Sequence, residues 1–186
     1  MPRPQCSAFL AVSLDGFVAR PGGGLDWLKA VESPGEDYGF AEFFGAIDTL
    51  VVGRGTYDVV RGFAEWPWAG KRVVVLTHRP PAPRHGETFA SGAPGAIVAS
   101  LGGAGARRLY VDGGATVSAF LRAGLLDDLT VSVVPVVLGD GIRLFQPPLP
   151  ERKLLLREAR AFPSGLVRLR YDAGPRDASS AASTSR

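Results

Sequence analysis

Two apolar runs in this chain, residues 50–52 and 107–112, each end at a glycine turn that is followed by a helical pattern. The turn Gly53-Arg54-Gly55-Thr56 follows the first run, and Gly113-Gly114-Ala115-Thr116 follows the second. A strand, a tight turn and a helix in this order form a βα unit, and such units build parallel sheets with helices on their faces. The repeated unit therefore predicts an α/β fold.

The last third of the chain contains strand-like segments without helices between them. A run at 129–138 carries Pro135 as a bulge or edge position, and 153–161 and 166–171 flank a Pro-Ser-Gly turn. This predicts a mixed sheet with an antiparallel C-terminal hairpin. Further segments are expected as strands at 6–13 and 72–77 and as helices at 37–46 and 96–101.

Length and composition favour one globular domain at 1–172 followed by a disordered tail at 173–186. Hydrophobic residues make up 46% of the 186 residues and charged residues 21%, whereas the tail carries almost no large apolar side chain. No apolar run reaches the roughly 18 residues of a membrane span, and no signal sequence is visible. We therefore expect a cytoplasmic protein without a membrane partner.

Charge and metal-ligating residues exclude two further classes. The net charge of +3 comes from scattered basic residues rather than a stripe, which argues against nucleic-acid binding. Cys6, His78 and His85 are the only Cys and His residues, too few for a tetrahedral zinc site. No metal is expected, although carboxylates alone could form a metal site.

The two glycine turns are candidate phosphate sites, because a helix that opens at a glycine presents free backbone N–H groups and the positive end of its dipole. Two such sites suit a dinucleotide, although each could be only a tight βα turn. Thr77-His78-Arg79, directly after another strand, offers a hydroxyl, an imidazole and a guanidinium to a phosphomonoester. Alternatively, these three are ordinary loop residues.

Two further residues could lie in a substrate pocket. Asp37 precedes an aromatic helical segment, so it is either an N-cap or a catalytic carboxylate. Trp27 is either a core residue or a pocket wall. The residues alone leave both questions open.

Five motifs in order give the chain a specific resemblance: Ser13-Leu14-Asp15-Gly16-Phe17-Val18-Ala19, Gly53-Arg54-Gly55-Thr56-Tyr57, Val111-Asp112-Gly113-Gly114, Pro135-Val136-Val137-Leu138-Gly139-Asp140-Gly141 and Gly165-Leu166-Val167-Arg168-Leu169-Arg170-Tyr171. From Ser7 to Tyr171 the chain resembles the dihydrofolate reductase-like superfamily. Within it, the chain resembles the family that shares a domain with the reductase half of the bifunctional riboflavin-biosynthesis deaminase-reductase.

The resemblance implies a mixed sheet flanked by helices, with NADPH bound across its carboxyl edge. It implies that Ala11, Val18 and Ala19 hold the nicotinamide carboxamide. It places the phosphates at Gly53, Arg54 and Thr56, the 2′-phosphate at Thr77, His78 and Arg79, and the pyrophosphate at Gly113, Gly114, Ala115 and Thr116. Trp27, Asp37 and Ser132 would line the substrate pocket, with Asp37 as the catalytic acid.

The function implied is an NADPH-dependent reductase that transfers a hydride to the C=N or C=O bond of a small pterin-like or pyrimidinone-like heterocycle. The alternative is a non-catalytic nucleotide-binding module of the same fold. Relatives of the riboflavin type are usually dimers, so the resemblance also implies a homodimer. No site for a sugar phosphate and no deaminase zinc signature is visible in the sequence.

Overall fold

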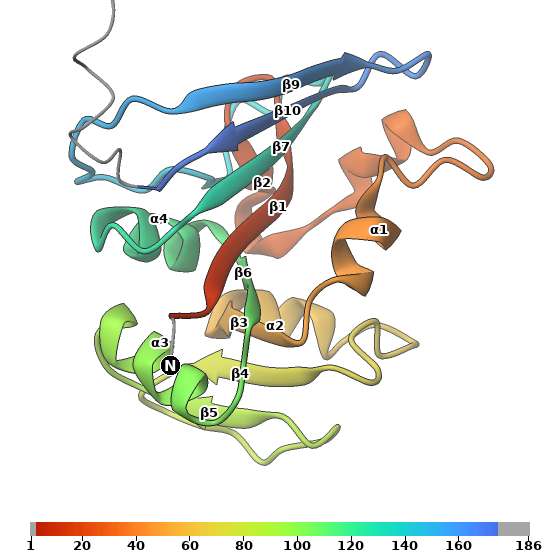
Figure 1. The fold of residues 1–186 in the computed structure, drawn as a ribbon. Helices are drawn as coiled ribbons and strands as arrows, with labels where there is room; N and C mark the ends of the chain where they lie inside the picture. Colours follow the sequence, from red (N-terminus) through yellow and green to blue (C-terminus); the bar gives the residue numbers. More distant parts are fainter. Residues whose placement is uncertain (1–2, 175–186) are drawn as a thin grey trace, which may run out of the picture.

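A central sheet of eight strands, in the order β5-β4-β3-β6-β1-β7-β10-β9, organises the protein (Figure 1). The computed structural model describes residues 3–174. The strands of this sheet are β1 (Gln5–Ser13), β3 (Thr49–Gly53), β4 (Arg72–Leu76), β5 (Thr88–Ala90), β6 (Arg108–Asp112), β7 (Asp128–Val134), β9 (Leu155–Ala161) and β10 (Val167–Asp172), and a separate pair is formed by β2 (Phe17–Ala19) and β8 (Ile142–Arg143). The helices are α1 (Phe40–Gly45), α2 (Arg54–Val60), α3 (Pro94–Gly103) and α4 (Gly114–Arg122), with 3₁₀ turns η1 (Pro21–Gly23) and η2 (Asp26–Val31).

The predicted mixed sheet with an antiparallel C-terminal hairpin is confirmed. The six strands from β5 to β7 are parallel, and β10 pairs antiparallel with both β7 and β9. Both predicted βα units are present, because β3 leads directly into α2 and β6 leads through Gly113 into α4. The carboxyl ends of β3, β6, β1 and β7 consequently share one edge of the sheet.

Helices cover both faces of the sheet, and alternation along the strands determines which residues face which helices. Val111 of β6 belongs to one buried cluster, together with side chains of α3 and α4 such as Ile97 and Phe120. Tyr110, the preceding residue of β6, belongs to a second cluster that contains Tyr57 of α2. Residues 110 and 112 of β6 therefore face the same side as α2.

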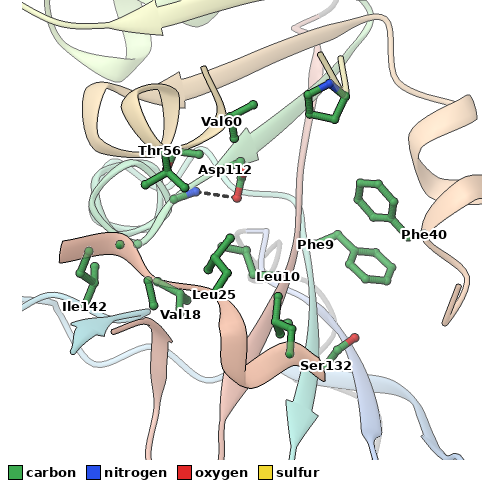
Figure 2. A pocket seen from close by; sticks show the side chains of 18 of the residues that line it. Phe9, Leu10, Val18, Leu25, Phe40, Thr56, Val60, Asp112, Ser132 and Ile142 are labelled. Atoms are coloured by element: carbon green, nitrogen blue, oxygen red, sulfur yellow. Dashed lines mark hydrogen bonds between the residues drawn. The ribbon is translucent and has the colours of Figure 1, made fainter. Parts of the chain in front are cut away.

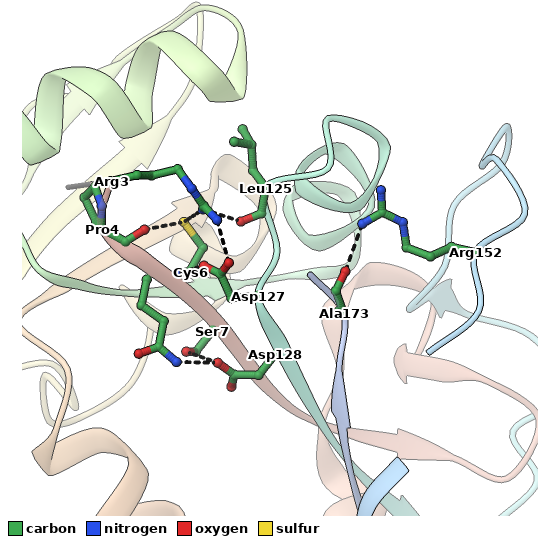
Figure 3. A network of polar contacts seen from close by, with 10 residues as sticks. Arg3, Pro4, Cys6, Ser7, Leu125, Asp127, Asp128, Arg152 and Ala173 are labelled. Carbon is green, nitrogen blue, oxygen red and sulfur yellow. Dashed lines mark hydrogen bonds and ion pairs between the residues drawn. The ribbon is translucent and has the colours of Figure 1, made fainter. Parts of the chain in front are cut away.

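Polar contacts at the amino ends of β1 and β7 fix the register of these two strands (Figure 3). The Ser7 hydroxyl donates to Asp128 at 2.7 Å, and the Cys6 amide donates to Asp127 at 2.8 Å. In this register Ala11 lies opposite Ser132. Contacts at one end of the sheet thus determine which side chains meet at the other end.

Three sequence expectations need correction. β7 ends at Val134, so Pro135 follows the strand rather than interrupting it; β7 has partners on both sides, and a proline nitrogen has no hydrogen to donate. Ala173 is buried and its carbonyl accepts a hydrogen bond from Arg152, so the predicted tail does not begin there (Figure 3). The short strands β2, β5 and β8 were not expected, because two or three residues carry too little pattern.

Residues 175–186 of the predicted tail lie outside the described residues. Within residues 3–174, no helix is both long and apolar enough to cross a membrane. In the same range, no three His, Cys, Asp or Glu side chains gather as a metal site.

Candidate functional site

A cavity of about 1120 Å³ opens at the carboxyl edge of the parallel strands (Figure 2). Its lining comes from the ends of β1, β3, β6 and β7, from the first turns of α2 and α4, and from the segment that runs from η1 to α1. Parallel strands leave a crevice at such an edge, and helices that begin there direct their first N–H groups toward it. The cavity is large enough for a dinucleotide and a small second ligand.

The two glycine turns interlock at the cavity edge. Gly113 has a φ of 93°, which favours glycine, and a Cβ at this position would clash with the Thr56 hydroxyl. A Cβ on Gly114 would clash with the Arg143 carbonyl oxygen. The close packing of the turns therefore requires these glycines, whether or not a ligand approaches them.

The first turn of α4 provides a cradle for an anion. Helix geometry leaves the first N–H groups of α4 without intrahelical partners, and Gly113 has no side chain to cap them. Thr56 and Thr116 both line the cavity beside this turn. These donors fit the pyrophosphate of a dinucleotide such as NADPH.

Arg54 is held in place at the start of α2. Its Nε donates to Asp58 at 2.8 Å, and its Nη1 donates to the carbonyl oxygen of Arg79 at 2.7 Å. The second contact brings the segment after β4 next to the start of α2. Thr77, His78 and Arg79 themselves do not line the cavity, so a contact with the 2′-phosphate remains a prediction.

The other residues that the resemblance assigns to the cofactor lie together in the structure. All of them line the one cavity: Ala11, Val18, Ala19, Gly53, Arg54, Thr56, Gly113, Gly114, Ala115 and Thr116. Their individual contacts with NADPH stay predictions.

Asp37 is an N-cap. Its carboxylate accepts hydrogen bonds from the amides of Gly39 at 2.9 Å and Ala41 at 2.8 Å, ahead of and within α1. These bonds lower the pKa of Asp37, and the side chain is exposed on the rim of the cavity. A general acid that works near neutral pH needs a raised pKa instead, so this environment favours the capping alternative for Asp37 over the catalytic one.

Trp27 and Ser132 have different environments. Trp27 packs in a buried cluster with Val31, Val134 and Leu166 and does not line the cavity, so it is a core residue rather than a pocket wall. Ser132 does line the cavity and is only 3% exposed, and its hydroxyl has no hydrogen-bond partner among the described residues (Figure 2). An unpartnered buried hydroxyl on a cavity wall is suited to a ligand.

Asp112 is the titratable group that sequence reasoning missed as a functional residue. It ends β6, lines the cavity and accepts a hydrogen bond from the Gly113 amide at 2.8 Å (Figure 2). Desolvation raises the pKa of its carboxyl to about 6. The signal was present in the motif Val111-Asp112-Gly113-Gly114, but alternation along β6 had to be combined with the position of α2 to show that Asp112 faces the cavity.

Known proteins match this chain over nearly its whole described length. The family model for the RibD C-terminal domain matches residues 4–168. The "Uncharacterized protein YwjB" of Bacillus subtilis is 34% identical over 166 residues, which cover 88% of this chain and 94% of that protein. The crystal structure of a "Putative riboflavin biosynthesis protein" from Shewanella sp. PV-4 superposes with a TM-score of 0.84 at 32% identity and covers 90% of this chain and 98% of its own.

Two more distant structures share the fold. One is the diaminohydroxyphosphoribosylaminopyrimidine deaminase/5-amino-6-(5-phosphoribosylamino)uracil reductase of Thermotoga maritima, with a TM-score of 0.69 and 17% identity over 91% of this chain and 56% of its own. The other is dihydrofolate reductase from Enterococcus faecalis complexed with NADP(H), with a TM-score of 0.66 and 16% identity over 90% of this chain and 95% of its own. The fold is therefore that of the dihydrofolate reductase-like proteins.

Proposed function

Because this chain belongs to the RibD C-terminal domain family, we propose that it is an NADPH-dependent reductase that acts on the C=N or C=O bond of a small heterocycle. The observation that carries the proposal is the single cavity that joins both glycine turns to the unpartnered hydroxyl of Ser132. One ligand with two phosphates and a second, smaller ligand can occupy it together. The dihydrofolate reductase of Enterococcus faecalis, which has the same fold, is complexed with NADP(H).

In this proposal the chain binds and orients both ligands. The N–H groups at the start of α4, with Thr56 and Thr116, hold the pyrophosphate, and Arg54 adds a positive charge beside it. When bound, NADPH supplies the hydride. Ser132 donates or accepts a hydrogen bond at the substrate ring and so orients it. The buried thiol of the single Cys6 suits the reducing cytoplasm, where we expect the protein to act.

Asp112 is the group we assign to proton transfer. Reduction of a C=N or C=O bond needs one proton besides the hydride, and a carboxyl with a pKa of about 6 is partly protonated near neutral pH. Asp37 has a lowered pKa and both of its oxygens accept backbone hydrogen bonds, which makes it a poorer donor.

The proposal is tested by a fluorescence titration with NADPH together with an NADPH oxidation assay over a panel of pterins and pyrimidinones. We expect saturable binding and oxidation with at least one substrate. Binding without oxidation across the panel would support the alternative, a non-catalytic nucleotide-binding module. If NADPH does not bind, both functions are wrong.

The variant Asp112→Asn tests the acid. Turnover of the wild type should fall as pH rises through about 6, and the variant should lose about a hundredfold in kcat together with this pH dependence. Asp112 also makes the stability of the protein depend on pH. Because its folded-state pKa lies above the ordinary value of 3.8, the free energy of unfolding of the wild type falls as pH rises from 3.8 to about 6. The melting temperature of the variant, relative to wild type, should therefore increase over the same interval.

The control is Asp140→Asn. Asp140 accepts a hydrogen bond from the next amide, that of Gly141, in the same way, but it is exposed and lies outside the cavity. This variant should retain the pH profile of the wild type. An unchanged profile in the Asp112 variant would remove Asp112 from the mechanism.

A further inference from the structure

The rim of the cavity carries negative charge where the segment between η2 and α1 borders it. Glu32, Glu36 and Asp37 all line the cavity and are exposed to solvent. Glu36 accepts a hydrogen bond from the amide of Tyr38, which holds its carboxylate close to this segment. A ligand substituent that leaves the cavity on this side must pass three carboxylates.

No positive charge balances these carboxylates within the cavity. Arg54 is the only cation among the described residues that line it, and it lies at the start of α2, where the proposed function assigns its charge to the cofactor phosphates. Arg168 lies near Asp37, but it donates to the carbonyl of Tyr38 and to Glu158. Neither guanidinium is free to receive a phosphate at this rim.

The wall below the rim is apolar. Phe9 and Phe40 meet edge to face with their centroids 5.5 Å apart, and Leu28, Val134 and Leu166 continue the surface (Figure 2 shows the two phenylalanines with Ser132). Ser132 contributes a neutral hydroxyl to this wall, and that hydroxyl lacks a partner among the described residues. Such a wall favours a planar, uncharged ring with one or a few hydrogen-bonding atoms.

From the charge of the rim and the apolar wall, we infer that the substrate is an uncharged planar heterocycle without a phosphate group. This inference rests on the proposed reductase function and narrows its substrate class. It separates this chain from a reductase of 5-amino-6-(5-phosphoribosylamino)uracil, the activity named for the Thermotoga maritima protein of the same fold. A phosphate at the rim would be repelled by these carboxylates, which lowers the affinity of the phosphorylated ligand. The repulsion is stronger at short distance and weaker at high salt.

The test compares matched ligands by calorimetry on the protein with and without saturating NADP⁺. The ligands are 5-amino-6-(ribosylamino)uracil, its 5′-phosphate and 6-methylpterin. We expect the riboside to bind about tenfold or more tightly than its phosphate at low salt, and the difference to shrink at 0.5 M salt, a concentration at which the screening length is only about 4 Å. We expect 6-methylpterin to bind at least as tightly as the riboside.

Each result decides a separate point. Tighter or equal binding of the phosphate overturns the inference and leaves the reductase proposal intact. Failure of all three ligands to bind also overturns the inference. Failure of NADP⁺ to bind overturns the proposed function, while the ligand series without NADP⁺ still tests the charge discrimination.

The double variant Glu32→Gln/Glu36→Gln isolates the rim. Gln at position 36 retains an acceptor for the Tyr38 amide, so the variant removes two charges with little change in structure. The ratio of the riboside affinity to the phosphate affinity should fall at least about threefold in this variant. Glu151→Gln, an exposed position outside the cavity, should leave the preference unchanged; equal preference in all three proteins would overturn the role of the rim.

Discussion

Asp37 and Asp112 both line the cavity, yet their pKa values shift in opposite directions. Asp37 is exposed and accepts two backbone hydrogen bonds, which stabilise its charged form. Asp112 accepts one such bond and is desolvated, which stabilises its neutral form. At the scale of single residues, hydrogen bonds and desolvation therefore decide which carboxyl can carry a proton near neutral pH.

The variant Asp37→Asn separates a cap from a catalytic acid. Asn keeps one acceptor and most capping ability, so we expect turnover within threefold of wild type and a melting temperature lower by at most about 4 °C. Because the pKa of Asp37 is lowered in the folded state, its carboxylate stabilises the fold only where it is charged. The difference in melting temperature between wild type and variant should therefore vanish as pH falls below the ordinary value of 3.8 and then through the folded-state pKa. A hundredfold loss of kcat at an unchanged melting temperature would instead establish the catalytic role.

Arg79 tests the choice of cofactor. The contact between Arg54 and the Arg79 carbonyl places the segment 77–79 beside the start of α2, where a 2′-phosphate could be bound. We expect NADPH to bind at least about tenfold more tightly than NADH, since a charge-assisted hydrogen bond is worth about 1.5–3 kcal/mol. Arg79→Ala should weaken NADPH binding and so reduce the ratio of NADPH affinity to NADH affinity, as measured by calorimetry.

Arg107→Ala is the matched control for this experiment, because Arg107 is also exposed but lies at the opposite end of the parallel strands. It should change neither affinity. Equal affinities of the wild type for NADPH and NADH would contradict the assignment of residues 77–79.

At the scale of the elements, the two βα turns form one unit. Gly113 packs on Thr56 of α2, and Gly53 leaves just enough room for the Thr116 hydroxyl of α4. Each turn therefore positions the first turn of the other helix. The cradle for the pyrophosphate depends on both turns at once.

Gly114→Ala should break this unit. The added Cβ would clash with the backbone carbonyl oxygen of Arg143, so the start of α4 or the strand β8 must move. We expect a stability loss of about 1–3 kcal/mol by denaturant unfolding and at least about tenfold weaker NADPH binding. The control is Gly103→Ala in α3, where an added Cβ would meet nothing within 4 Å, so this variant should be neutral or slightly stabilising. Equal stability and NADPH affinity of the two variants would contradict the interlock of the two turns.

At the scale of the whole molecule, the sheet has two edges, β5 and β9. β7 lies between β1 and β10, so the apolar side chains of this strand are mostly buried, whereas Val137, which follows the strand, is 68% exposed. The edge strand β9 also exposes apolar side chains, because Leu155 and Leu156 are 42% and 50% exposed. An exposed edge strand with apolar side chains favours association.

We expect a homodimer that uses this β9 edge. Light scattering should give twice the 19.6 kDa of the chain at micromolar concentration, and Leu156→Lys should give the monomer mass. Thr88→Lys, on the opposite edge strand β5, is the control and should remain dimeric. A monomer mass for the wild type would contradict the expectation.

The sequence by itself determined the βα units, the mixed sheet and the two glycine turns that border the cavity. These features depend on local signals: an apolar run, a glycine turn and a helical pattern are all contained in a few consecutive residues, such as 107–117. The parallel sheet then brings the ends of its strands to one edge. For this reason the two glycine turns, at Gly53 and Gly114, line one cavity, and Ala11, which only the family resemblance indicated, lines it as well.

Only the tertiary structure decided the roles of the side chains within that site. Trp27 became a core residue because η2 packs it against β7 and the C-terminal hairpin, and Asp37 became a cap because α1 begins three residues after it. Asp112 acquired its raised pKa from desolvation by elements far away in the sequence. Burial and hydrogen bonding depend on long-range packing, so no local pattern in the sequence could have distinguished these residues.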